Sequence, residues 1–233
     1  MLNARKALFV VPSALVLALA IAGCEDPTEG KPRATVSSAA PAAPAAPGAQ
    51  TQAGQTQAAS TTAGATETLA LDTTASAVGF LGSKVTGKHE GKFDKVTGSI
   101  TLAGGKAEGG KIAIEVETAS VKTDSEGLDK HLKAPDFFDV EKFPKATFTS
   151  TEIKAGGSNG ATHTVTGELD LHGVKKTISF PATINVSADG VTGTSEFVIN
   201  RKDFGITIAG KPDDLIRDDV ALKLSLKASR KKG

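Results

Sequence analysis

The chain has 233 residues, of which 39% are hydrophobic and 23% are charged, enough for one medium-sized domain with additional segments. Lys and Arg number 27 against 26 Asp and Glu, and this net charge of +1 gives no global field that would attract nucleic acid. One cysteine and no Trp or Tyr exclude intrachain disulfides, cysteine-based zinc sites and tyrosine chemistry. A ligand must therefore be held mainly by aliphatic side chains and phenylalanine.

Residues 1–23 have the layout of a bacterial secretory signal. Two basic residues precede an apolar run over residues 7–21, and Ala22 and Gly23 lead directly to Cys24. The segment Ile21–Cys24 is similar to the lipobox of bacterial lipoproteins, in which the cysteine becomes the acylated first residue of the mature chain. A chance cysteine after an ordinary signal and an uncleaved anchor are the alternatives. The position of the sole cysteine favours lipidation, which would hold the protein at a membrane.

Residues 24–68 are expected to form a disordered tether. The segment consists mainly of Ala, Pro, Thr, Gln, Gly and Ser, and Val36 is its only aliphatic residue larger than alanine. A segment without apolar side chains to bury gains nothing that offsets its ordering entropy. We therefore expect it to space a folded domain, residues 69–230, from the membrane.

The domain itself shows a period of two, which is typical of strands with one buried face. Gly-rich and Asp-Gly turns separate these strands, so neighbours are expected to be antiparallel. About eight segments alternate in this way: 78–80, 96–102, 112–117, 146–149, 165–171, 178–186, 191–199 and 220–227.

One region, residues 124–143, breaks the alternation. Leu128 and Leu132 stand at helical spacing, and Pro135 stops the turn. The sequence predicts one short helix here, followed by a loop that carries Phe137 and Phe138.

Antiparallel strands with one apolar face bury it by pairing two sheets or by closing one sheet into a barrel. Gly98, Gly167, Ala182 and Gly193 occupy apolar-phase positions and favour a barrel with internal volume. The alternative is that these glycines relieve strain at bends or bulges, which needs no ligand. If a cavity exists, its apolar wall suits a long hydrocarbon chain.

Five motifs resemble the YceI family of secreted bacterial proteins, in the order that this family shows. The resemblance extends over about residues 69 to 227. Its motifs are Phe80 and Lys84 with Gly91–Phe93 and Val96–Ile100; Leu128–Asp139, which ends in D-F-F-D; Lys142–Phe148, with F-P-x-x-x-F; Gly167–Lys176, with G-x-L-x-L-x-G-V; and Asn200–Ile206, with R-x-D-F-G-I.

This resemblance implies an all-β fold, an extended antiparallel lipocalin-like barrel that encloses a hydrophobic tunnel. It also implies binding of a polyisoprenoid, an isoprenoid quinone or a fatty-acid-like amphiphile in the periplasm or outside the cell, without established catalysis. The chain departs from many relatives in its expected lipid anchor and in lacking the Tyr and Trp that some relatives place in the tunnel.

Candidate tunnel residues are apolar side chains of the strands and of the 124–143 region. Each would look the same as an ordinary core residue, and the loop residues among them suit either a lid or an anchor for the loop. The candidates are Phe80, Phe93, Ile100, Leu132, Phe137, Phe138, Phe148, Leu169, Phe180, Phe197 and Ile199.

His131, Arg201 and Asp203 are candidate contacts for a polar head group. Each also has a structural alternative: His131 can pair with Asp129, and Arg201 can pair with Asp203 or with another nearby acid.

No histidine pair has a metal-binding spacing, no phosphate-binding Gly-rich loop precedes Lys-Ser/Thr, and the domain has no cysteine nucleophile. The sequence therefore predicts no metal, no cofactor and no catalytic residue. The hypothesis is a lipid-anchored protein on the periplasmic side of the inner or outer membrane that carries, stores or sequesters an amphiphile. The alternative is an envelope stress or scaffold protein that acts through protein partners, with no ligand in the tunnel.

Overall fold

The computed structural model describes residues 26–38 and 65–230, so Cys24, the signal region and most of the expected tether lie outside it. Three helical segments are present in this part of the chain: α1 (Glu126–Lys133) and the 3-10 turns η1 (Thr118–Ser120) and η2 (Arg201–Phe204). The strands are β1 (Thr35–Ser38), β2 (Thr66–Ala70), β3 (Ala77–Lys84), β4 (Gly87–Phe93), β5 (Val96–Ala103), β6 (Lys106–Glu117), β7 (Val121–Thr123), β8 (Lys145–Ala155), β9 (His163–Leu171), β10 (Val174–Ser187), β11 (Gly190–Asn200), β12 (Gly210–Lys211), β13 (Asp214–Leu215) and β14 (Asp219–Ser229).

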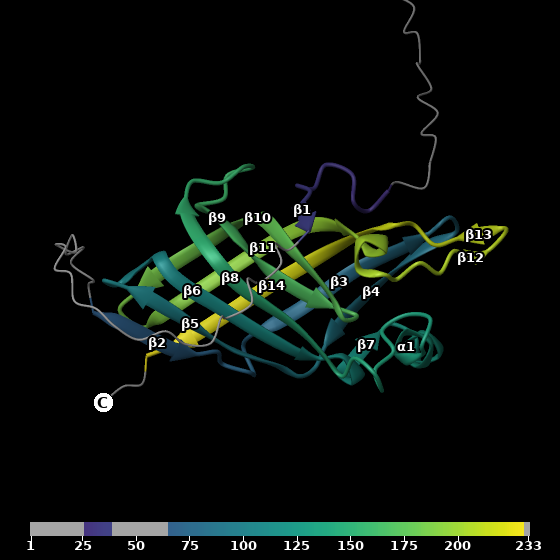
Figure 1. The fold of residues 1–233 in the computed structure, drawn as a ribbon, viewed down its shortest axis with the longest axis horizontal. Coiled ribbons are helices and arrows are strands. Elements are labelled where there is room, and N and C mark those ends of the chain that lie inside the picture. Colours follow the sequence, from purple (N-terminus) through teal and green to yellow (C-terminus); the bar gives the residue numbers. More distant parts are fainter. Residues whose placement is uncertain (1–25, 39–64, 231–233) are drawn as a thin grey trace, which may run out of the picture.

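The strands form one long, curled antiparallel sheet (Figure 1). Its order is β2-β5-β6-β8-β9-β10-β11-β14-β3-β4-β7, with β1 added beside β10 and a separate β12–β13 hairpin. All eight segments that alternate in the sequence are strands, and the break in the alternation is α1 followed by a loop. The predicted all-β barrel-like fold with one short helix is confirmed.

Turn chemistry sets the strand register. The β9–β10 hairpin turns at His172 and Gly173, whose φ angles of 55° and 72° fit a two-residue turn that matches strand twist. In β14 the leucines at 222, 224 and 226 point to one face, and the exposed residues at 223, 225 and 227 point to the other. This phase keeps the apolar face inside the curl.

β4 and β7 lack the alternation that identifies the other strands. β4 reads GKHEGKF and has Phe93 as its only large apolar side chain, while β7 has three residues. Both are held by backbone pairing with a neighbour, β3 for β4 and β4 for β7. Backbone hydrogen bonds therefore hold these two strands, and hydrophobic patterning does not predict them.

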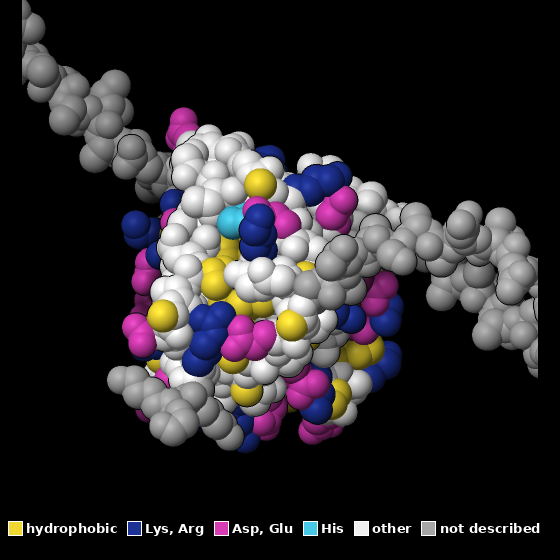
Figure 2. All heavy atoms as spheres, turned by 90° about the vertical axis from the view of Figure 1, so that its left-hand side faces the viewer, with side chains coloured by type: hydrophobic (Ala, Val, Ile, Leu, Met, Phe, Trp, Pro, Cys, Tyr) yellow, Lys and Arg dark blue, Asp and Glu magenta, His cyan; other side chains and the backbone are white. Residues whose placement is uncertain are grey.

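One end of the sheet closes on itself. Leu71, just after β2, bridges to Ala228 of β14, and Arg230 binds Glu67 with 2.7 Å between guanidinium and carboxylate. Figure 2 looks onto this end, where lysine, arginine and acidic side chains are spread around the rim.

The N-terminal segment, residues 26–38, enters the sheet. The register of the β10–β11 ladder would set Ser179 opposite Val198 if it continued. Instead Ser179 pairs with Thr35, and the amide of Val198 donates to Pro32 O at 2.8 Å. The segment thus fills a gap between β10 and β11.

This placement differs from the expected tether over residues 24–68. Backbone hydrogen bonds and ion pairs hold residues 26–38 despite their polar composition, and Ala34 and Val36 pack against the core. Hydrophobic patterning misses such a segment because its main interactions are made by the backbone and by charges. β2 also begins inside the expected tether, at Thr66.

Candidate ligand-binding cavity

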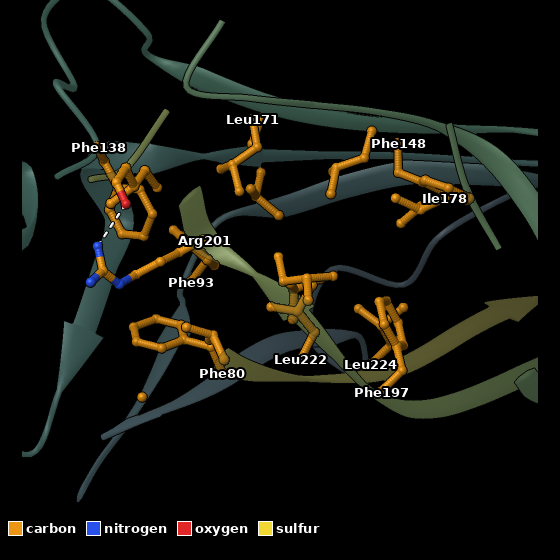
Figure 3. A pocket seen from close by; sticks show the side chains of 18 of the residues that line it. Phe80, Phe93, Phe138, Phe148, Leu171, Ile178, Phe197, Arg201, Leu222 and Leu224 are labelled. Atoms are coloured by element: carbon orange, nitrogen blue, oxygen red, sulfur yellow. Dashed lines mark hydrogen bonds between the residues drawn. The ribbon is translucent and has the colours of Figure 1, made fainter. Parts of the chain in front are cut away.

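An apolar cavity of about 180 Å³ lies inside the curled sheet, and Figure 3 shows side chains that line it. It reaches α1 at Leu132 and the chain after β13 at Ile216 and Arg217. Carbon atoms make up nearly all of its wall, and the polar residues that border it are Ser83, Thr147, Arg201 and Arg217. An engineered apolar cavity of about 150 Å³ stays dry and binds benzene. The cavity as it stands therefore suits a small apolar group, and a longer chain requires it to widen or to remain open at one end.

Two groups of phenylalanine rings shape the cavity. Near its α1 end, Phe93 lies 5.9 Å from Phe80 and 5.7 Å from Phe138, measured between ring centroids. Deeper in the sheet, Phe180 stacks on Phe197 with 4.1 Å between centroids. Both groups border the cavity, so aromatic rings form a large part of its wall.

The segment after α1 closes one side of the cavity. Leu132, Phe137 and Phe138 all line it, and the amide of Phe138 donates to Leu132 O at 3.0 Å. The buried Asp129 fixes α1 by accepting hydrogen bonds from Thr123 N at 2.6 Å and Thr123 Oγ1 at 2.8 Å. These bonds hold the pKa of Asp129 below its ordinary value, and Lys122 adds to the effect.

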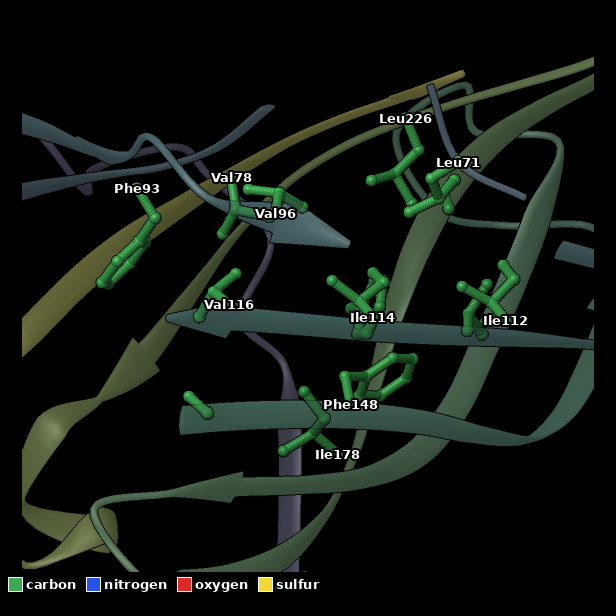
Figure 4. Close-up of a cluster of buried hydrophobic side chains, with 14 of the residues drawn as sticks. Leu71, Val78, Phe93, Val96, Ile112, Ile114, Val116, Phe148, Ile178 and Leu226 are labelled. Carbon is green, nitrogen blue, oxygen red and sulfur yellow. The ribbon is translucent and has the colours of Figure 1, made fainter. Parts of the chain in front are cut away.

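Around this cavity the structure brings together every predicted tunnel residue except Ile100. Those present are Phe80, Phe93, Leu132, Phe137, Phe138, Phe148, Leu169, Phe180, Phe197 and Ile199. Ile100 is buried in another part of the interior, where aliphatic side chains pack closely around Leu71, Ile112 and Leu226 (Figure 4). A role for the ten in ligand binding stays a prediction.

The glycines that favoured internal volume do not produce the cavity. Gly98, Gly167 and Gly193 are absent from its wall, and so is Ala182. A Cβ on Gly98 would lie 2.1 Å from Ala113 O, and one on Gly167 would lie 2.4 Å from Thr149 O. These two glycines permit close backbone approach, which is the structural alternative that the sequence left open.

Arg201 reaches the cavity but uses its donors on the protein. Its guanidinium donates to Ile206 O at 2.6 Å, Ile216 O at 3.2 Å and Asp218 Oδ1 at 3.1 Å. Of the local pairings that the sequence allowed, the one with another nearby acid is present, since Arg201 pairs with Asp218. The one with Asp203 is not, because Asp203 is exposed on η2 and the side chain of Arg201 is buried. Burial lowers the pKa of Arg201, and Asp218 opposes that shift.

His131 lies outside the cavity wall. Its Nε2 is 3.0 Å from Asp136 Oδ2, and its ring meets Phe137 edge-on. The expected pairing of His131 with Asp129 is wrong, since Asp129 binds Thr123 and Lys122. His131 and Asp203 therefore have no contact with the cavity in this structure, and Arg201 alone of the three candidates borders it.

Sequence reasoning missed three polar residues that border the cavity, Ser83, Thr147 and Arg217. Ser83 is buried, and its Oγ has no hydrogen-bond partner. Arg217 follows β13 and pairs with Asp26 at 3.0 Å. Ser83 occupies a polar phase of β3, and the β12–β14 connection carries no pattern, so neither had a local signal.

The described residues contain no group of three or more His, Cys, Asp or Glu positioned to hold a metal ion. Within those same residues, no helix is long and apolar enough to cross a membrane. Gly156–Gly160 has the G-x-S-x-G spacing, but it is an exposed connection between β8 and β9, not the strand-to-helix turn that presents a nucleophile.

A curled antiparallel sheet around an apolar cavity defines a class of proteins that bind hydrophobic ligands. Residues 69–228 match the family model of the YceI-like domain, and the chain belongs to this family. It is 34% identical over 139 residues to a UPF0312 protein of Pseudomonas putida (strain W619), covering 57% of this chain and 71% of that one. It is 37% identical over 141 residues to a UPF0312 protein of Pseudomonas savastanoi pv. phaseolicola, with the same coverage.

Solved structures show the same fold. BcnA of Burkholderia cenocepacia is 26% identical, with a TM-score of 0.61 over 68% of this chain and 99% of that one. A polyisoprenoid binding domain from Saccharophagus degradans is 21% identical, with a TM-score of 0.55 over 70% of this chain and 98% of that one. The second likeness shows the fold alone.

Proposed function

We propose that this protein binds one long-chain amphiphile, of polyisoprenoid, isoprenoid quinone or fatty-acid type, and carries or stores it at the cell envelope without chemical change. The observation that supports this most is the cavity, whose wall offers hydrocarbon contact almost throughout. Burying each methylene of a ligand there contributes about 0.8 kcal/mol. A domain of the same fold is named for binding polyisoprenoids, in keeping with this ligand class.

The polar end of the ligand is proposed to lie beside Arg217, which borders the cavity. Arg217, 37% exposed, has donors left beyond its bond to Asp26. The apolar chain then runs between the phenylalanine groups.

The location forms part of the proposal. Cys24 is proposed to be acylated, so that the mature chain is anchored on the periplasmic side of the inner or outer membrane, after removal of residues 1–23. Two or more acyl chains hold a protein stably, whereas one holds it marginally.

A chain-length series tests the binding. Affinity for fatty alcohols and polyprenols is expected to rise about fourfold for each added methylene and then to level off when the cavity is full. Leu222→Asn, in the cavity wall, should weaken binding, and Lys223→Asn, on the outer face of the same strand, should leave it unchanged. Lipid extracts of the purified protein, identified by mass spectrometry, give the native ligand. Empty extracts together with no uptake of any probe would refute binding and favour the scaffold alternative.

A further inference from the structure

The N-terminal segment ties one end of the domain to the expected anchor. Asp26 Oδ2 lies 3.0 Å from Arg217 Nη1, and Arg217 borders the cavity. Lys31 and Arg33 bind Glu196 of β11 and Asp219 of β14, which fixes the segment along these strands. Figure 1 shows the purple segment over the half of the molecule that carries β12 and β13.

Only one residue separates Asp26 from Cys24. An extended chain spans at most about 3.3–3.6 Å per residue, so two residue steps cover about 7 Å. If Cys24 carries lipid, as proposed above, the bilayer surface lies within that distance of the Asp26 backbone. The connection between the anchor and the Arg217 side of the domain is therefore short.

The same end presents apolar side chains to solvent. Among the described residues the large hydrophobic side chains that are exposed are Val85, Leu215 and Val186, at 50%, 47% and 38%. Val85 and Leu215 are neighbours, since the amide of Val85 donates to Leu215 O at 3.1 Å. They lie at the β3–β4 turn and in the β12–β13 hairpin, far from Val186 near the β10–β11 turn.

We call the β3–β4 turn and the β12–β13 hairpin, residues 84–88 and 210–215, the tip. It carries three lysines and two aspartates; Lys88, Lys211 and Asp213 are exposed, and Lys84 pairs with Asp214. An exposed apolar pair flanked by lysines suits the interface of a bilayer, where aliphatic groups insert and ammonium groups stay at the head groups. The small net charge means that insertion and the anchor, more than attraction to anionic lipid, would hold the tip there.

The tip also adjoins the cavity. Gly82 and Ser83 precede it on β3, Ile216 and Arg217 follow it after β13, and all four line the cavity. The amide of Arg217 donates to Ser83 O at 2.8 Å, which joins the two arms of the tip.

We infer that the tip is the surface that meets the lipid bilayer, so that the cavity receives or delivers its apolar chain at the membrane on which the protein is anchored. This inference rests on the proposed function for the lipid on Cys24 and for the nature of the ligand. The sequence alone suggested a domain held away from the membrane by a long tether. In the arrangement inferred here, the cavity end of the domain is held at the membrane surface.

Depth-dependent quenching tests the orientation in the lipidated full-length protein, reconstituted into phosphatidylethanolamine and phosphatidylglycerol vesicles that contain spin-labelled lipid. Cys24 is the sole cysteine and its sulfur is blocked by lipid, so a fluorophore attaches only to a new cysteine. Val85→Cys and Leu215→Cys labels are expected to be quenched several-fold more than a Val186→Cys label. Equal quenching at the three positions, or stronger quenching at Val186, overturns the inference.

Two further measurements separate the possible failures. The mass of the purified protein shows whether Cys24 carries lipid, and an unmodified cysteine overturns both the anchoring and the orientation while leaving cavity binding to its own test. Val85→Asp combined with Leu215→Asp is expected to slow transfer of a fluorescent fatty alcohol from vesicles several-fold, with unchanged affinity for the probe in solution. Val186→Asp is the matched control, and equal transfer rates for the two variants contradict the inference.

Discussion

The two halves of the barrel interior come from one alternating pattern and yet are filled differently. In the half whose end is closed by the bridge from Leu71 to Ala228, here called the closed half, aliphatic side chains such as Leu71, Ile112 and Leu226 pack together (Figure 4). Ile100 and Leu102 are buried in the same cluster. In the other half, phenylalanines from the strands and from the loop after α1 line the cavity, and α1 with that loop covers one side of it. Alternation thus places apolar groups inside, whereas side-chain shape and the closing loop decide whether the inside is solid.

The largest effect is expected from opening a hole in the closed half. Leu102 is fully buried, so Leu102→Ala should lower the free energy of unfolding by about 2–5 kcal/mol. Leu222→Ala in the cavity wall should cost less, because Leu222 already borders open space. Urea unfolding of both variants measures the difference. Equal costs would contradict the distinction between the halves.

The next effect concerns the polar support of the cavity half. Arg201→Met keeps an apolar chain of similar length but removes the buried hydrogen bond to Ile206 O and the part-buried ones to Ile216 O and Arg217 O. Each unsatisfied buried acceptor costs about 1–3 kcal/mol, less where water reaches it. The variant should therefore be destabilised by about 1–3 kcal/mol, as measured by urea unfolding. Lys202→Met, which removes an exposed lysine bound to the same Asp218, is the control and should change stability little.

A smaller effect on stability, with a clear effect on binding, is expected at Gly91. A Cβ there would lie 2.2 Å from Phe80 Cζ, so Gly91→Ala pushes the ring toward the cavity. Because the cavity gives the ring room to move, the variant should lose only about 1 kcal/mol in the free energy of unfolding. Affinity for long-chain alcohols should fall. Gly193→Ala is the control, since its methyl group meets only Leu226 Cβ at 4.0 Å, and a Gly91 variant that binds as the wild type does would exclude Phe80 from the ligand site.

The same contrast explains what the sequence could predict. Strands such as β14 and β11, and the helix around Leu128 and Leu132, follow from periodicity because burial of one face dictates both pattern and structure. The phenylalanines of the cavity could be predicted as inward-facing residues for the same reason. The position of Ser83 and Arg217 beside the cavity could not be predicted. A residue's partners across a sheet depend on the strand register, which is set by turns and bulges far along the chain.

The pairing of the N-terminal segment with the sheet could not be predicted either, for a related reason. Its place depends on the early end of the β10–β11 ladder, and a polar strand of four residues carries no periodic signal. Composition correctly described a segment with little to bury, but backbone donors left unpaired by two diverging strands supplied the binding energy.

The smallest effect on stability is expected from a change of pH, and it concerns α1 and the loop after it. Hydrogen bonds from Thr123 hold the pKa of Asp129 below its ordinary 3.8, so the folded state binds this proton less readily than the unfolded state. The stabilisation is therefore present above the ordinary pKa and is lost as the pH falls from about 3.8 through the lowered value. The protection factors of the α1 amides, which correct for the intrinsic pH dependence of exchange, should fall over this acid range before those of β14. In Asp129→Asn the α1 amides should exchange fast at neutral pH and lose this acid dependence; an unchanged profile would mean that other contacts hold α1 over the cavity.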